Sequence, residues 1–197
     1  MKRLSISFLC CVAFLFSFAQ TNYLELGNQQ LAREDFVAAE KTFRQAMHAD
    51  SSNLVYQCQL ALSLMSQKKY AEAQKFIDNV LLRDSTNKGA LWYGGMNNFQ
   101  NTDADLRVAI RYFERLLPLI DEKQGQYFSA SWFIGRSYQI LLQNDGLNYD
   151  ETSRMLDCYA TYLRLQPNAS DAQKIAVYVQ HIKEIRPPNS VKKWISR

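Results

Sequence analysis

Two stretches of this sequence align without a gap at an offset of 34 residues, and this repeat constrains the fold more than any other feature. "LGNQQLAREDFVAAEKTFRQAMHADSSN" occupies residues 26–53, and "LALSLMSQKKYAEAQKFIDNVLLRDSTN" occupies residues 60–87. Apolar and small positions coincide in the two stretches, and so do the closing tetrapeptides DSSN and DSTN. Self-similarity at a fixed period indicates an array of units that stack on one another to build a shared core.

Each unit has the spacing of two helices joined by a polar turn. In the second half of the first unit, Ala39, Phe43 and Ala46 recur at three- and four-residue steps, which is typical of a helix with one apolar face. The turns "REDF" and "QKKY" separate the two helices, and the closing DSSN and DSTN supply side chains that cap the next helix. No sustained two-residue alternation appears, so the sequence predicts helical hairpins and no strands.

This pattern resembles the tetratricopeptide repeat (TPR) family, which has a 34-residue unit of two helices. The resemblance implies an all-α fold, a right-handed superhelical solenoid of stacked helical hairpins with a C-terminal capping helix. It places small residues where helices approach closely, at Gly27, Ala39, Ala61, Ala73, Gly95, Ala109 and Gly135. Gly94 stands where the family has a larger apolar residue, so we expect a departure from regular packing there.

The N-terminus predicts export. Lys2 and Arg3 precede a short apolar run that ends in Ser17-Phe18-Ala19, which fits a signal peptide over residues 1–19. The run is short for a membrane anchor, which needs ~20 apolar residues. The alternative is an N-terminus that stays uncleaved and tethers the repeats to the membrane. On either alternative the protein is exported, and we expect it to be periplasmic or associated with the outer membrane.

The rest of the chain divides into repeats, a capping helix and a tail. The repeats cover about residues 20–53, 54–87, 88–124 and 125–168 of a solenoid that ends at residue 186. In the fourth repeat the turn between helices is expected to swell to "LLQNDGLNYDE". A capping helix follows at about 169–186, with Ser170 or Asp171 as its N-cap. Residues 187–197 are predicted to form a basic, solvated tail.

Composition argues against several functional classes. Without residues 1–19, 21 basic side chains face 19 acidic ones, and this balance gives no reason to expect a nucleic-acid partner. Cys58 and Cys158 permit one disulfide, although buried thiols are the default interpretation. Neither His48 nor His181 lies in a metal-binding spacing, and no nucleophile motif occurs. The sequence therefore predicts no enzyme, no cofactor and no metal site.

The resemblance also implies a binding face on the first helices of the repeats. In the third and fourth repeats that face carries Trp92, Met96, Phe99, Trp132 and Arg136. Trp and Arg are the residues that most often carry interface energy, and Met adapts to irregular surfaces. The alternative is that Trp92 and Trp132 belong to the core between hairpins, because large aromatic residues are mostly buried.

From the resemblance we expect a non-catalytic scaffold or adaptor in the cell envelope that binds a peptide or a partner helix in a concave groove. The alternative is a periplasmic chaperone or assembly factor for outer-membrane or secreted proteins. Membrane contact is expected only through an uncleaved N-terminus or the basic tail.

Overall fold

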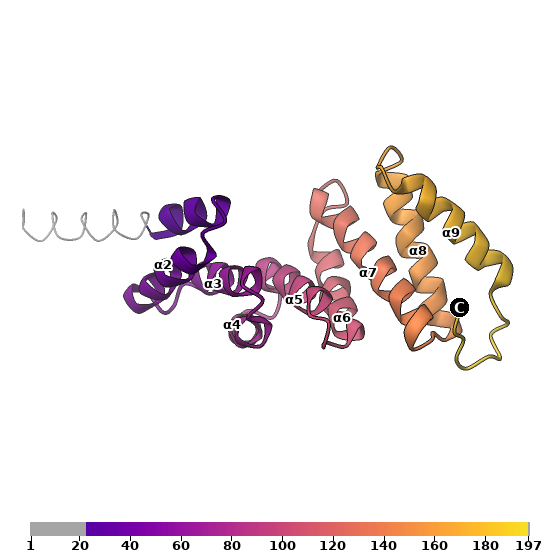
Figure 1. The fold of residues 1–197 in the computed structure, drawn as a ribbon, viewed down its shortest axis with the longest axis horizontal. Coiled ribbons are helices and arrows are strands. Elements are labelled where there is room, and N and C mark those ends of the chain that lie inside the picture. The colour runs from indigo at the N-terminus through magenta and orange to yellow at the C-terminus, as the bar shows by residue number, and fades with distance from the viewer. Residues whose placement is uncertain (1–22, 197) are drawn as a thin grey trace, which may run out of the picture. The chain divides into compact units, whose positions relative to one another are not determined.

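The computed structural model describes residues 23–196, and this range is helical with no strands. The predicted signal peptide, residues 1–19, lies outside the described residues. No helix between residues 23 and 196 combines the length and apolarity needed to cross a membrane. A helical segment at residues 23–32 comes first (Figure 1). The helices that follow it are α2 (Phe36–Ala49), α3 (Leu54–Ser66), α4 (Tyr70–Arg83), α5 (Lys88–Gln100), α6 (Leu106–Leu116), the 3-10 helix η1 (Leu117–Leu119), α7 (Gly125–Asn144), α8 (Tyr149–Leu165) and α9 (Ala172–Ile185).

Asparagine caps begin two helices where the sequence predicted them. The Val55 N–H donates to Asn53 Oδ1 at 3.0 Å at the start of α3, and the Ala90 N–H donates to Asn87 Oδ1 at 3.1 Å in α5. These bonds satisfy N–H groups that have no partner within the first helical turn. The predicted role of DSSN and DSTN as punctuation between repeats is therefore confirmed.

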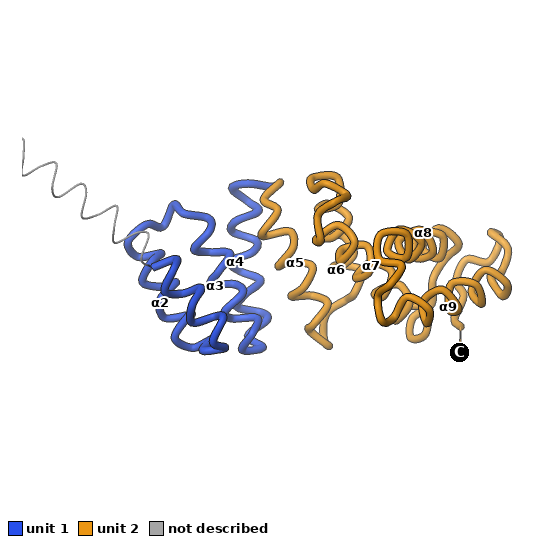
Figure 2. The backbone as a smooth tube through the Cα atoms, turned by 90° about the horizontal axis from the view of Figure 1, so that it is seen from above, with its two compact units in different colours: residues 1–85 blue, residues 86–197 orange. Residues whose placement is uncertain are grey.

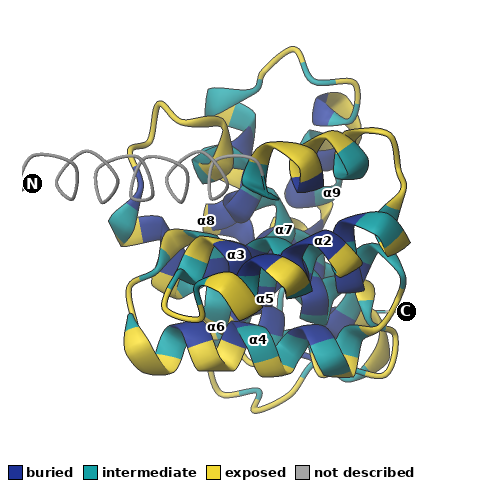
Figure 3. Cartoon of the chain, turned by 90° about the vertical axis from the view of Figure 1, so that its left-hand side faces the viewer, coloured by how far each residue is buried: buried dark blue, intermediate teal, exposed yellow. Residues whose placement is uncertain are grey.

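The first compact unit spans residues 1–85, and its described part holds the 23–32 segment and α2 to α4 (Figure 2). The helix α3 packs against both α2 and α4, and most of its side chains from Tyr56 to Met65 are buried. The helices α2 and α4 bury one face and expose the other, as the burial colouring in Figure 3 shows. The turn geometry also repeats, because Glu34 and Lys68, 34 residues apart, both have a φ of 61°.

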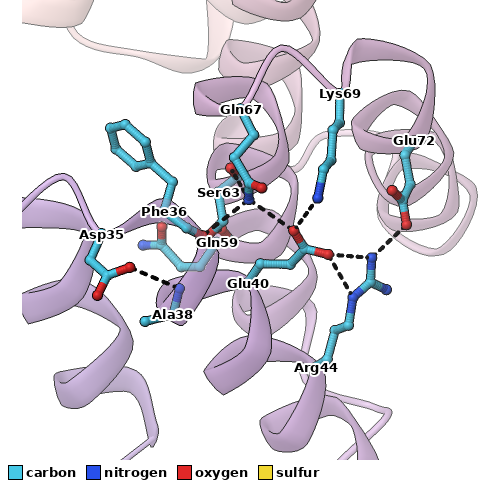
Figure 4. Close-up of polar contacts among 10 residues, drawn as sticks. All are labelled: Asp35, Phe36, Ala38, Glu40, Arg44, Gln59, Ser63, Gln67, Lys69 and Glu72. Carbon is cyan, nitrogen blue, oxygen red and sulfur yellow. Dashed lines mark hydrogen bonds and ion pairs between the residues drawn. The ribbon is translucent and has the colours of Figure 1, made fainter.

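A polar network centred on Glu40 joins the first hairpin to the second (Figure 4). The Glu40 carboxylate accepts hydrogen bonds from Arg44 Nη2 at 2.9 Å, from Gln67 Nε2 at 2.8 Å and from Lys69 Nζ at 2.8 Å. Arg44 also pairs with Glu72 on α4. Partial burial opposes ionisation of Glu40, but the bonds from Lys69, Arg44 and Gln67 outweigh it and lower its pKa to about 2. The network therefore holds Glu40 charged at any physiological pH.

The second unit, residues 86–197, contains α5 to α9, and each helix packs against the next (Figure 2). Pro118 lies in η1, just after α6 ends at Leu116, because proline lacks the N–H that a continuing helix requires. The long turn predicted over "LLQNDGLNYDE" is wrong. The buried Leu141 and Leu142 continue α7 to Asn144, so only residues 145–148 separate α7 from α8. Asn148 then starts α8 in a capping box with Glu151.

The C-terminal segment returns to the turn between α7 and α8, where the sequence predicted a solvated tail. Leu147 and Trp194 exchange backbone hydrogen bonds of 2.9 and 2.8 Å, and Lys193 Nζ lies 2.8 Å from Asp145 Oδ1. Gly146 makes this approach possible, since its φ is +88° and a Cβ there would lie 2.9 Å from the Trp194 carbonyl oxygen. No sequence pattern predicts this pairing, because it involves only one residue from each segment.

Candidate functional site

Five aromatic rings of the second unit form one cluster across α5, α6 and α7. Phe133 on α7 is its centre: its ring lies 4.9 Å from Phe99, 5.1 Å from Trp132 and 5.3 Å from Phe113, measured between centroids. Trp92 completes the cluster at 5.6 Å from Phe113 and 6.0 Å from Phe133. Most of these pairs meet edge to face, which is a favourable geometry for aromatic rings.

The cluster is buried on one side and reaches solvent on the other. Phe113 is fully buried, whereas Trp92, Phe99, Trp132 and Phe133 are each only partly buried. The two tryptophans thus fit neither of the sequence-based alternatives completely, because their rings pack on the core and also face outward. The cluster presents a partly exposed aromatic surface carried by three helices.

The other two predicted binding residues lie apart from these ring contacts. Met96 is half-buried on α5, one turn after Trp92. Arg136 is half-buried on α7 and lies near Tyr159, where burial raises the pKa of the phenol and the positive charge of Arg136 opposes that rise. The structure therefore brings Trp92, Phe99 and Trp132 together through Phe133, and it places Arg136 beside the buried Tyr159.

An open cleft of about 620 Å³ adjoins Phe99. It lies between the turn that joins α5 to α6 and the C-terminal half of α7, and Leu106, Arg107, Ile140, Leu141 and Asp145 contribute to its lining. Arg107 donates from Nη1 to Asp145 Oδ2 at 2.6 Å and from Nε to Glu151 Oε1 at 3.1 Å. These bonds fix the charged side of the cleft, and hydrogen bonds from Lys193 and Arg107 lower the pKa of Asp145.

The seven predicted packing residues are all buried. A Cβ added to Gly27 would lie 2.3 Å from Phe43 Cζ, one on Gly95 would lie 2.5 Å from Phe113 Cε1, and one on Gly135 would lie 2.8 Å from Tyr159 Cδ1. In the first, third and fourth hairpins, then, an aromatic ring of the second helix packs against a glycine of the first. The second hairpin carries Ala61 and Ile77 in the corresponding slots, both buried.

Gly94 departs from the repeat pattern for a similar reason. A Cβ at Gly94 would lie 2.7 Å from Tyr112 Cδ1, so Gly94 and Gly95 admit two neighbouring rings of α6. The glycine pair therefore lets α6 approach α5 closely. This close approach brings Phe113 within reach of Trp92 and Phe133.

The titratable groups of the described residues offer little for covalent chemistry. Burial raises the pKa of Cys58 to about 11 and that of Cys158 to about 12, so both thiols are protonated at neutral pH. Both are free and buried, as the default interpretation of the sequence predicted. Between residues 23 and 196 no three histidine, cysteine or acidic side chains converge in a geometry that could hold a metal ion.

Sequence reasoning missed two residues that shape the surface. Phe133 lies one position after the predicted Trp132. It was not predicted, because the repeat pattern assigns only one residue of each helical turn to the binding face. Asp171, one of the two residues predicted to cap α9, is its N-cap residue, but its side chain makes no capping bond. It instead accepts hydrogen bonds from Trp132 Nε1 at 2.9 Å and Tyr162 Oη at 2.7 Å. No sequence pattern links residues 132, 162 and 171, which come from three different elements.

Comparisons with known proteins support the fold. No family model matches the sequence, and no curated protein matches it. Among solved structures, two crystal structures of MamA superpose with TM-scores of 0.67 and 0.65 at 20% and 19% identity. They cover 85% and 81% of this chain and 84% and 85% of the MamA chains. A MamA mutant superposes with a TM-score of 0.66 at 12% identity, over 85% of this chain and 90% of its own.

The chain is therefore similar to MamA in fold, and its fold class is all-α and TPR-like. The prediction of stacked helical hairpins with a further C-terminal helix is confirmed. At these identities the likeness concerns the fold alone.

Proposed function

We propose that this protein is a non-catalytic interaction scaffold that holds a peptide or helix of a partner protein on its second unit. The observation that carries the proposal is the partly exposed aromatic cluster next to an open cleft of about 620 Å³. Aromatic residues are enriched where proteins bind one another, and well-packed aromatic anchors carry much of the binding energy.

The placement of the rings on packed helices favours this function. Phe99, Trp132 and Phe133 lie within helices, and Phe113 supports Phe133 from the core in a stacked arrangement. A partner would meet rings that are already in place, so less conformational entropy is lost on binding. The charges beside the cleft are engaged in ion pairs, Arg107 with Asp145 and with Glu151. This pairing supports a binding role over a catalytic one.

A place in the cell envelope belongs to the same proposal and rests on the N-terminal sequence, which lies outside the described residues. Sequencing the N-terminus of the protein purified from its own organism tests it. A mature chain that starts at Gln20 supports export and cleavage of the signal peptide. A chain that starts at Met1 in the cytoplasmic fraction contradicts both.

The binding role is tested by comparing what two variants retain from the native organism. We expect the Phe99→Ala/Trp132→Ala variant to lose a partner that copurifies stoichiometrically with the wild type. The matched control is Leu82→Ala, which removes a large apolar side chain that is 85% exposed on the first unit. Retention of helical content by circular dichroism shows that the fold survives.

Each result of this purification has a defined meaning. Many substoichiometric clients would indicate a chaperone instead of a scaffold. A partner kept by the double variant would place binding elsewhere on the chain. The absence of any partner from the wild type would count against both functions.

A further inference from the structure

A small hollow lies beside the aromatic cluster, and its lining has an unusual composition. Its volume is about 220 Å³, and it is lined by four aromatic rings, one serine and one carboxylate: Phe128, Ser129, Trp132, Phe133, Tyr162 and Asp171. We call it the Asp171 hollow. Its volume is below the ~300–1,000 Å³ of ordinary small-molecule pockets, so it fits a single side chain.

The carboxylate of the Asp171 hollow is held by neutral groups only. Trp132 Nε1–H donates to Oδ2 and the Tyr162 hydroxyl donates to Oδ1, one bond to each oxygen. No lysine, arginine or histidine within residues 23–196 forms an ion pair with Asp171. Each oxygen keeps a further lone pair, since a carboxylate offers about four acceptor sites. The aromatic rings therefore line a hollow that also contains a carboxylate without an ion-pair partner among the described residues.

This arrangement selects a cation over an apolar occupant. A leucine or phenylalanine side chain in the hollow would strip water from Asp171 without replacing its hydrogen bonds, and burying a charge in that way is costly. A cation is attracted both by the carboxylate and by the negative faces of the aromatic rings. Arginine fits better than lysine, because its planar guanidinium stacks on aromatic rings and can donate two bonds to one carboxylate.

We infer that the Asp171 hollow receives an arginine side chain of the partner protein. This inference rests on the proposed function, because it names the chemistry of the partner that the aromatic surface holds. The hollow shares Trp132 and Phe133 with the aromatic cluster, so an arginine seated in it would continue directly into apolar contacts. The expected partner segment thus carries an arginine next to large apolar side chains.

The three tryptophans of the chain allow a direct test in solution. Acetyl-arginine-amide is titrated into the full-length protein while the indole N–H resonances of Trp92, Trp132 and Trp194 are followed by heteronuclear NMR. We expect a saturable shift of the Trp132 resonance with a Kd on the order of millimolar, as suits a single side chain. Trp194, which pairs with the turn at Leu147, serves as the unperturbed reference.

Matched probes and variants separate the charge from the rings. Acetyl-citrulline-amide has nearly the same shape without the charge, and acetyl-leucine-amide is purely apolar. We expect both to bind at least tenfold more weakly than the arginine probe. Asp171→Asn should abolish the preference for arginine, and Phe128→Leu should weaken binding by about two- to fivefold through the lost ring. Asp157→Asn removes the same charge from an exposed position on α8 and should leave binding unchanged.

Several outcomes would overturn the inference. They are a citrulline or leucine probe that binds as tightly as arginine, an arginine affinity that survives Asp171→Asn, and no saturable shift at tens of millimolar. Its failure is distinguishable from failure of the proposed function. If arginine does not bind but Phe99→Ala/Trp132→Ala still releases a partner, only the chemistry assigned to the hollow is wrong. If arginine binds and the variant keeps its partner, the hollow binds arginine, but the partner is held elsewhere on the chain and the proposed role of the aromatic surface fails.

Discussion

The two units build their hairpins in the same way but join them differently. In the first unit, a polar network of Glu40, Arg44, Gln67, Lys69 and Glu72 bonds α2, α3 and α4 to one another beside the apolar packing of α3. In the second unit, rings of α5, α6 and α7 fill the corresponding joint, although Arg154 and Glu114 also pair α8 with α6. Within hairpins, both units match a small residue to a large one. Packing within hairpins is thus alike in the two units, and the contacts between hairpins differ. We call the polar network of the first unit the polar joint and the ring contacts of the second unit the aromatic joint.

Disrupting the aromatic joint should lower the free energy of unfolding more than disrupting the polar joint does. Phe113→Ala removes a fully buried ring, which costs about 3–5 kcal/mol of unfolding free energy. Phe113 also stacks on Phe133, and we expect a double-mutant cycle of Phe113→Ala and Phe133→Ala to show a coupling of about 0.5–1.5 kcal/mol. Urea unfolding measures both quantities.

Ile77→Ala in the first unit is the matched control for Phe113→Ala, since Ile77 occupies the equivalent slot and has no ring. A coupling energy near zero between Phe113 and Phe133 would show that the two rings stabilise the second unit only through their buried volume. The contacts between hairpins would then not differ in kind between the two units.

The polar joint should show itself in the pH dependence of stability. The pKa of Glu40 is lowered from 4.5 to about 2 in the folded protein, so its contribution is complete above pH 4.5 and is lost as the pH falls toward 2. Because the side chain of Glu40 is only 14% exposed, we expect Glu40→Gln to cost about 2–3 kcal/mol at neutral pH. Urea unfolding of both proteins between pH 7 and pH 2 should give curves that converge on acidification. Curves that stay parallel would show that the network contributes no charge-dependent stability.

The match within hairpins can be tested by exchanging one pair for another. Gly27→Ala raises helix propensity by about 1 kcal/mol, but it forces a Cβ to within 2.3 Å of the Phe43 ring, and overpacking costs about 1–3 kcal/mol. We expect a net loss of about 1 kcal/mol. Adding Phe43→Ile recreates the Ala61 and Ile77 pair of the second hairpin and should recover part of that loss. Strictly additive effects of the two substitutions in urea unfolding would contradict a direct fit between these positions.

Much of the fold could be predicted from the sequence because the repeat specifies contacts at fixed separations. Gly27 and Phe43 meet within one hairpin, and the caps Asn53 and Asn87 act on the helices that follow them at once. Such contacts depend on local spacing and on helix geometry, which a single sequence reveals.

The site was less predictable because its contacts join residues that no period relates. The turn after α7 was predicted too long, since Leu141 and Leu142 are read as loop unless one knows that they are buried. The pairing of Trp194 with Leu147 and the bonds from Trp132 and Tyr162 to Asp171 both depend on how separate elements pack. Packing of this kind is decided by the whole unit and leaves no local sequence pattern.

The smallest change in the free energy of unfolding should come from removing one partner of an exposed ion pair. This change is compared with the one expected at Glu40. Arg164 pairs with Glu122 in the second unit, where the two side chains are 58% and 47% exposed. Water screens such a pair and the two side chains lose freedom when they meet, so we expect Glu122→Gln to change the unfolding free energy by less than about 0.5 kcal/mol. Urea unfolding of Glu122→Gln and Glu40→Gln in one buffer compares the two positions directly. A loss at Glu122 equal to that at Glu40 would mean that the burial and multiple bonds of Glu40 add nothing, and that the polar joint of the first unit is no more than surface charge.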